Sequence, residues 1–325
     1  DDQKKVTPLD FYDGNAALTE VFHALSVTFP VGETFFINSV MHYAPRIRTK
    51  HPELWKQVQL FFKQEGMHTA VHEAWNDRIQ QEYGHPMDEI EKTIDKRLTV
   101  AKKILHPIVQ LAITSCLEHW TAGLGHILIC TPTGKAIMDR CAEPYRSLWA
   151  WHALEEIEHK SVAFDVFRAM GGGYFTRTFV MLIVSVHFLY RVTQIWWNLA
   201  ITRRRLGKWA SVKELVYFLF LSPGILSKLV PHYLAWFKPG YHPSNQYGAE
   251  ERLPVLEQMK ALQAKAVAPR PEDLEIFGND TDEVIVLAPT PAVVSGEAPK
   301  LRKERKTTRS ALKKGANAER QRSRM

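Results

Sequence analysis

The 325-residue sequence predicts an all-α protein, and three observations support this prediction. Apolar residues recur with helical periodicity over long windows, whereas the alternation typical of strands is scarce. Apolar residues make up 45% of the chain, which is enough for a sizeable core. Some prolines and glycines, such as Pro52, Pro107 and Gly171, fall at the edges of the periodic windows, where helices begin and end.

The first half of the chain contains three helical windows. The first runs from Ala16 to about Tyr43, and we expect a break or kink at residues 30–32 because proline disrupts a helix interior. The second should run from about Pro52 to Tyr83, since proline suits the first turn of a helix. The third, from Met87 to about Ile104, reads as part of a long crossover to the second half.

Two more long helices follow the crossover. One is expected from about Pro107 to Ile129 and the other from about Glu143 to Met170, where the glycines at 171–173 end the pattern. We therefore expect residues 1–174 to form a helical bundle.

Residues 175–240 are expected to form accessory apolar helices. The window 175–201 is the most apolar of the chain, although a membrane-spanning helix needs about 20 apolar residues and this window is borderline. The window 215–237 should be broken at Pro223 and at Pro231. The pattern fits helices packed on the bundle, and it also fits a membrane-dipping hairpin or a lid over an apolar substrate.

Residues 241–325 are expected to form an extended, largely disordered tail, because Pro, Thr, Ala and charged residues dominate its later part. The segment from Lys300 onwards has a net charge of +9, so the other residues sum to about −2 and the basicity belongs to the tail. Such a tail is solvated or contacts anionic lipid or nucleic acid. We expect no specific nucleic-acid binding.

The chain has three cysteines with no disulfide or zinc spacing, which suits a reducing compartment. Its polar start lacks a secretory signal. We therefore expect a cytoplasmic protein, with attachment to the inner face of the membrane if the apolar helices contact lipid.

Two short motifs carry the candidate chemistry. Glu65 and His68 are three residues apart within one expected helix, and Glu156 and His159 repeat this spacing in another, so each pair shares a helix face. Each pair follows a further glutamate in another apolar helix, Glu33 and Glu118. The chain contains two more Glu-x-x-His motifs, starting at residues 20 and 82. We set both aside, because the first lacks a comparable preceding acid and the second runs into Gly84-His85-Pro86.

Four carboxylates and two imidazoles are the ligand set of ferritin-like di-iron or di-manganese proteins, in which four helices each present an inward acid. We therefore predict a ferritin-like four-helix bundle that holds two iron ions, with manganese or zinc as alternatives. Glu33, Glu65 and His68 are assigned mainly to one metal. Glu118, Glu156 and His159 are assigned mainly to the second metal. Glu65 and Glu156 are the predicted bridges between the two metals.

Three other histidines lie on or near the ligand faces. His72 is two helical turns after Glu65, and His152 is one turn before Glu156. His126 lies about two turns beyond Glu118. Each is either an additional ligand or a hydrogen-bond partner of one. His119 follows Glu118 directly and should point elsewhere.

At these residues the sequence resembles a bacterial family known as predicted metal-dependent hydrolases. The resemblance covers roughly residues 15–240. It is carried by four stretches: Phe29-Pro30-x-Gly32-Glu33-x-Phe35-Phe36, Gln64-Glu65-x-x-His68, Leu117-Glu118-His119, and Glu155-Glu156-x-Glu158-His159-Lys160-x-Val162-Ala163-Phe164-Asp165. The family name implies hydrolysis, whereas the ligand pattern is similar to that of ferritin-like di-iron proteins.

Three functions follow from this site. The first is a di-iron oxygenase or oxidase, in which dioxygen is the co-substrate, an unidentified donor supplies electrons and a small, apolar organic molecule is oxidised. The second is a two-metal hydrolase of an ester, amide or phosphoester. The third is a non-catalytic metal-binding bundle. The sequence does not determine the oligomeric state; a homodimer is one option, since helical bundles often pair through their outer faces.

Overall fold

The structure is a computed structural model that describes residues 10–246. The predicted tail lies outside these residues, apart from its first six positions. Residues 10–246 are almost entirely helical and contain no β-strand; one isolated antiparallel bridge joins Tyr12 to Cys141. The all-α prediction is therefore confirmed.

The helices occur in two runs along the chain. The first run comprises α1 (Ala16–Ser26), α2 (Phe29–Met41), α3 (Ala44–Lys50), α4 (Pro52–Tyr83), α5 (Met87–Ile104) and α6 (Pro107–Cys130). The second run comprises α7 (Pro132–Met138), α8 (Tyr145–His159), α9 (Val162–Ala169), α10 (Tyr174–Trp196), the π-helical η1 (Trp197–Arg203), α11 (Lys208–Val216), the π-helical η2 (Tyr217–Leu221), α12 (Ile225–Ala235) and the 3₁₀ turn η3 (Pro243–Asn245).

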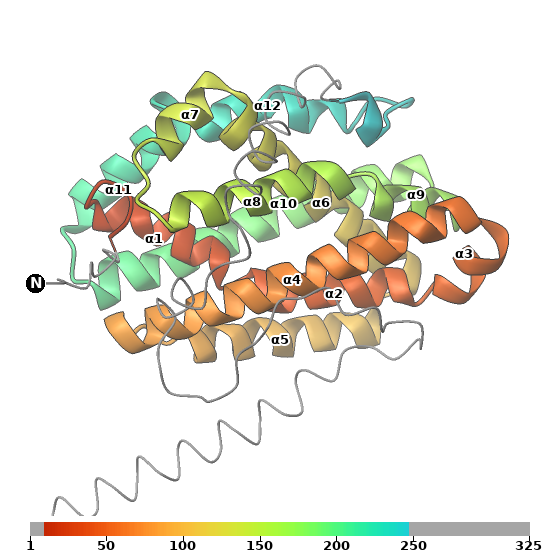
Figure 1. Cartoon of the computed structure of the whole chain (residues 1–325), viewed down its shortest axis with the longest axis horizontal. Coiled ribbons are helices and arrows are strands. Elements are labelled where there is room, and N and C mark those ends of the chain that lie inside the picture. The colour runs from red at the N-terminus through yellow and green to blue at the C-terminus, as the bar shows by residue number, and fades with distance from the viewer. Residues whose placement is uncertain (1–9, 247–325) are drawn as a thin grey trace, which may run out of the picture. The chain divides into compact units, whose positions relative to one another are not determined.

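Four helices form a bundle. α2 packs against α4, α6 packs against α8, and contacts between α2 and α6 and between α4 and α8 close the arrangement. Figure 1 shows α2, α4 and α5 running side by side. Gly125 allows α6 and α8 to approach closely, because a Cβ at this position would lie 2.7 Å from the carbonyl oxygen of Ala153. The bundle thus brings one face of each of four helices together.

Three expected boundaries differ from the structure. Pro30 lies in the first turn of α2, so the break falls two residues earlier, at Val27 and Thr28. The expected helix over 143–170 is divided into α8 and α9 around Lys160 and Ser161, which no proline or glycine marks. Pro231 lies inside α12 and does not end it.

The accessory helices pack directly on the bundle. The indole N–H of Trp120 on α6 donates to Ser185 Oγ on α10 over 2.9 Å. The indole N–H of Trp196 at the other end of α10 donates to the carbonyl of Ala17 on α1, also over 2.9 Å. These buried indoles combine large apolar contact with a satisfied donor, so they fix α10 against α1 and α6.

Candidate metal centre

Each helix of the bundle contributes one buried glutamate to its interior. Glu33 comes from α2, Glu65 from α4, Glu118 from α6 and Glu156 from α8, and none is more than 3% exposed. An isolated carboxylate is costly to remove from water, and four together also repel one another. A buried cluster of this kind needs cations or protons as compensation.

The side chains form two overlapping groups with the geometry of a metal site. In the first, ligand atoms of Glu33, His68, His152 and Glu156 lie within 4.8 Å of one another. In the second, Glu65 and His159 join His68 and Glu156 within the same limit. Since His68 and Glu156 belong to both groups, the arrangement suits two neighbouring metal ions.

Glu118 completes the set beside the second group. Its Oε2 atom lies 2.9 Å from Nδ1 of His159, while Nε2 of that ring lies 3.5 Å from Glu65 Oε1. All six predicted ligands therefore line one buried centre, together with His152. Their binding of metal remains a prediction.

The unsatisfied atoms of the centre fit bound metals. Almost all buried polar atoms in proteins have a hydrogen-bond partner. Here each predicted ligand has at least one buried oxygen or nitrogen without one: Glu33 Oε1, Glu65 Oε1 and Oε2, His68 Nδ1, Glu118 Oε1, Glu156 Oε2 and His159 Nε2. Carboxylate oxygen and imidazole nitrogen are donors that iron, manganese and zinc accept, so divalent ions would satisfy these atoms together.

The metal-free centre retains protons where metals would bind. Burial, reinforced by the charge of Glu156, raises the pKa of Glu33 well above its usual range. Burial raises the pKa of Glu118 to about 7. Burial alone would lower the pKa of His159, but the charge of Glu118 raises it to about 9. Metal binding must displace such protons, so metal affinity should rise with pH.

A hydrogen-bond chain determines which nitrogen of His72 carries its proton. The amide nitrogen of Asn76 donates to the carbonyl of Ser26 and to Glu91 Oε1, which turns Asn76 Oδ1 toward the Ser26 hydroxyl. That hydroxyl donates to Oδ1 over 2.7 Å. It must therefore accept the 2.9 Å hydrogen bond from Nδ1 of His72.

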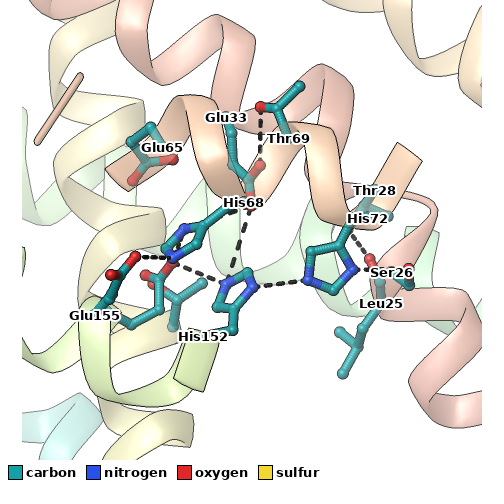
Figure 2. A network of polar contacts seen from close by, with 12 residues as sticks. Leu25, Ser26, Thr28, Glu33, Glu65, His68, Thr69, His72, His152 and Glu155 are labelled. Carbon is teal, nitrogen blue, oxygen red and sulfur yellow. Dashed lines mark hydrogen bonds and ion pairs between the residues drawn. The ribbon is translucent and has the colours of Figure 1, made fainter. Parts of the chain in front are cut away.

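The same chain orients His152 for metal binding. With its proton on Nδ1, His72 can only accept at Nε2, which lies 2.7 Å from Nδ1 of His152 (Figure 2). His152 then donates from Nδ1, and the lone pair of its Nε2 faces Glu156 Oε1 at 2.9 Å. Two acceptors facing each other need a cation between them, either a proton or a metal ion that both residues would bind.

The three additional histidines thus take different places. His152 is in the first candidate group, whereas His72 makes hydrogen bonds through both nitrogens and supports His152. His126 belongs to neither group. His119, expected to point elsewhere, stacks on His232 and places Nδ1 2.9 Å from the hydroxyl of Tyr241.

Two residues that the motif analysis missed support the centre. Glu155 Oε2 lies 3.0 Å from Nε2 of His68, so the carboxylate can hold this ring with Nδ1 facing the other ligands (Figure 2). The hydroxyl of Thr69 donates to Glu33 Oε2 over 3.0 Å. Each is adjacent in sequence to a predicted ligand, and Glu155 also belongs to one of the stretches that carry the family resemblance.

The family model that matches the chain is described as "Predicted metal-dependent hydrolase", and it covers residues 2–247. This is about three quarters of the sequence. The chain belongs to the family of predicted metal-dependent hydrolases. Neither a curated protein nor a solved structure matches the chain. The family description agrees with the hydrolase alternative better than with the di-iron oxidase, while the buried cluster is compatible with both.

Glu20 and His23 of the first motif set aside in the sequence, and His85 of the second, form another buried cluster. Glu20 is fully buried on α1, with Oε2 3.0 Å from His23 Nδ1 and Oε1 2.8 Å from His85 Nε2. No metal-binding group within residues 10–246 includes them. Their spacing serves a hydrogen-bonded bridge between α1 and the loop that follows α4.

We expect this bridge to make the free energy of unfolding depend on pH. Burial would raise the pKa of Glu20, but hydrogen bonds from His23 and His85 lower it to about 2. The pKa of this carboxyl is lower in the folded protein than in the unfolded chain, where it is near 4.5. Such a carboxyl stabilises the folded protein at pH values above 4.5, and this stabilisation is lost as the pH falls toward 2.

Glu20→Gln should therefore lower the free energy of unfolding by about 2–3 kcal/mol at pH 7, and the deficit should shrink below pH 4.5. Urea denaturation at several pH values measures this. Glu82→Gln is the matched control, because Glu82 belongs to the other rejected motif and pairs at the surface with Arg78. A deficit that is constant from pH 7 to pH 3 would contradict the assignment.

An apolar pocket of about 470 Å³ extends from the candidate metal centre. His152 and Glu156 form part of its wall, next to Phe29 and Trp149. Helices α1, α6, α10 and α12 and the segment η2 supply most of the remaining wall, and aliphatic and aromatic side chains dominate it. The volume lies in the range of small-molecule sites.

Filling the metal centre should stabilise the protein. Each site saturated at about 100 times its dissociation constant adds about 2.7 kcal/mol. In a fold of this size this raises the midpoint of thermal unfolding by about 5–10 °C. Calorimetry of chelator-treated protein with added Mn²⁺, Zn²⁺ or anaerobic Fe²⁺ measures the shift. Mg²⁺ is the control ion, since it prefers all-oxygen sites; an equal shift with Mg²⁺ would contradict the imidazole-containing centre.

Proposed function

We propose that the chain is a two-metal hydrolase that cleaves an ester or amide of an apolar substrate. The observation that carries this proposal is the contact between the apolar pocket and the ligand pair His152 and Glu156. The family description supports the reaction class. The pocket lining supports the substrate class, because it offers a large apolar surface and few polar groups.

The protein contributes position and exclusion of water. When bound, two divalent metals polarise a carbonyl and lower the pKa of water near them. Glu156 would serve both candidate groups, while His68, whose Nε2 faces Glu155, would offer its Nδ1 to one ion. The apolar pocket wall offers water few hydrogen-bond partners, and a bound apolar substrate would displace water from it, which strengthens electrostatic interactions at the reacting carbonyl. The substrate's apolar portion would lie between α6 and α10, and its reacting group would face α8.

Oxidation by a di-iron centre is the second candidate, and one observation favours it. Besides the metal-centre residues, polar side chains in the pocket wall are few, such as Thr121 and Thr193. A C–H bond needs no polar anchor, whereas an ester or amide carbonyl usually has one. The ligand set of carboxylates and imidazoles also suits iron and dioxygen. In this reaction dioxygen would be the co-substrate, with an electron donor still to be identified.

One experiment separates the two reactions. Metal-free protein is loaded with Zn²⁺ or Mn²⁺ and assayed with nitrophenyl esters of increasing acyl length. In parallel, anaerobic Fe²⁺-loaded protein is mixed with dioxygen, and oxygen uptake and the optical spectrum are recorded. Metal-dependent ester cleavage that rises with acyl length supports hydrolysis. Oxygen uptake without ester cleavage would overturn the hydrolase proposal in favour of the di-iron oxidase. Metal binding with neither activity would favour the non-catalytic bundle.

The pocket predicts a specific effect of Leu124→Trp. Leu124 lines the pocket on α6, and a tryptophan there should occupy part of its volume. We expect at least a tenfold loss of activity on long-chain substrates, a smaller loss on short ones and unchanged metal content. Leu98→Trp on α5 is the control, because Leu98 is half-buried outside this pocket. Equal losses for all chain lengths would argue against the pocket as the substrate site.

A further inference from the structure

The accessory helices expose an unusual amount of apolar surface. Within the described residues, the continuous helix Tyr174–Arg203 is long and apolar enough to cross a membrane, and its most apolar 18-residue window has a mean hydropathy of 1.5. Only 22% of its most apolar window is buried in the protein. The bent pair Lys208–Leu221 and Ile225–Ala235 passes the same test when taken together.

The exposed residues of α10 form one stripe. Phe175, Phe179, Ile183, Val186 and Tyr190 follow one another at intervals of three or four residues, which places them on one helix face. Each is more than half exposed, and Phe175 reaches 83%. A contiguous apolar stripe of this size on a soluble protein indicates an interaction surface.

The opposite face of α10 is bound to the bundle. Val180 and Met181 are buried there, and Ser185 accepts the hydrogen bond from Trp120. A helix fixed lengthwise on a bundle that contains buried charged groups cannot cross a bilayer by itself. The stripe is instead suited to lie in the plane of a membrane surface, with only its outer side chains in contact with lipid.

A second exposed apolar patch follows on α11 and η2. Trp209 is 79% exposed and Leu221 is 69% exposed, with Tyr217 and Phe220 between them also more than half exposed. The Lys208 ammonium lies 5.1 Å from the ring centre of Trp197 and 5.8 Å from that of Trp209. Tryptophan beside lysine is a combination typical of the boundary between lipid and water.

The charge of this region is almost entirely positive. Residues 174–240 contain nine Lys or Arg residues and one acid, Glu214, which already accepts a hydrogen bond from Asn15. Six of the cations are exposed: Arg203, Arg205, Lys208, Lys213, Lys228 and Lys238. Apolar stripes flanked by cations match an anionic bilayer surface, which attracts each nearby cation.

The pocket and the exposed patches share residues. Leu189 and Trp197 of the α10–η1 helix line the pocket and are at least 36% exposed. Val216 and Phe220 line it from α11 and η2 and are likewise exposed. The pocket that extends from His152 and Glu156 therefore reaches the surface amid the apolar side chains.

We propose that the outer face of α10, α11 and η2 inserts into the surface of an anionic phospholipid bilayer. The apolar substrate then passes from the bilayer between α10 and η2 to the metal centre. The second statement rests on the proposed function, whereas the lipid binding of this face does not.

Flotation of the full chain with vesicles tests the binding. Vesicles of phosphatidylglycerol and phosphatidylethanolamine are compared with pure phosphatidylcholine, using the metal-free protein so that the result is independent of enzyme activity. We expect co-flotation with the anionic vesicles. Phe179→Glu combined with Val186→Glu should reduce binding at least tenfold, because each change places a charge at the inserted stripe. Ile104→Glu is the control, since Ile104 is 73% exposed on α5.

The variants also distinguish this face from other contacts. If the basic segment after Lys300 alone binds the vesicles, the double variant will float like the wild type, and the proposal is wrong. If a second copy of the chain covers the stripe, the wild type will be a dimer that does not float and the double variant a monomer, which also overturns it. Unchanged circular dichroism and thermal unfolding of the variant exclude loss of fold as the cause of lost binding.

Discussion

Glu156→Ala should remove both metal ions from the protein. Glu156 belongs to both candidate groups, and His68, which the groups also share, lies 3.5 Å from its Oε1 atom. Alanine supplies no oxygen to either position, so we expect bound metal to fall from two ions to less than 0.2 per chain at micromolar metal, and catalytic turnover to fall by about 10³-fold or more. Elemental analysis after gel filtration measures the metal content.

The comparison variants make this result specific. His159→Ala should lose at least one ion, because His159 belongs to the second group only. Glu158→Ala should retain both, since Glu158 is exposed and accepts its hydrogen bond from Gln64 outside the two groups. Two ions per chain in Glu156→Ala would refute the assignment of the centre.

Glu65→Leu should have two effects of opposite sign. Both oxygens of Glu65 are buried without a hydrogen-bond partner, and burial together with the charges of Glu118 and Glu156 raises its pKa well above the usual range. Leucine is similar in size and removes a desolvated polar group. We expect the free energy of unfolding of the metal-free variant to be about 1–4 kcal/mol higher than that of the metal-free wild type.

The same variant should lose at least one metal ion, so added metal should stabilise it less than the wild type. Chemical denaturation with and without saturating Mn²⁺ gives all four free energies. Leu60→Glu serves as a control for altered charge, because Leu60 lies at the surface of α4 and is 53% exposed. A metal-free Glu65→Leu protein less stable than the wild type would show that Glu65 has a structural role of its own.

Sequence predicted the helices best where local chemistry determines their ends. α4 starts at Pro52, which suits a first turn, and ends before Gly84, whose left-handed φ of 69° few other residues adopt. The break between α8 and α9 carries no such signal. It lies beside His159, where the chain turns at Lys160, whose ammonium donates to the carbonyl of Gln246. A contact 86 residues away cannot be read from periodicity.

In the candidate metal centre, too, local spacing predicted some features, and contacts between residues distant in sequence determine the others. Helical spacing predicted which faces Glu65 and Glu156 would share with their histidines. It left the roles of His72 and His152 open, because these depend on Ser26 and Asn76, which lie 50 residues apart in sequence and meet only in the fold. The Glu-x-x-His spacing alone also could not distinguish the bridge at Glu20 from a metal site; the lack of a comparable preceding acid did so.

The unsatisfied atoms of the metal centre have a consequence for the amount of protein in a cell. Without metals, the burial of four carboxylates lowers the free energy of unfolding. A larger fraction of the metal-free chains is then transiently unfolded. Proteases and chaperones act on that population, so a difference of 1–2 kcal/mol changes abundance several-fold. The steady-state level of this protein should therefore follow metal supply, with starved cells degrading copies that metal-replete cells retain.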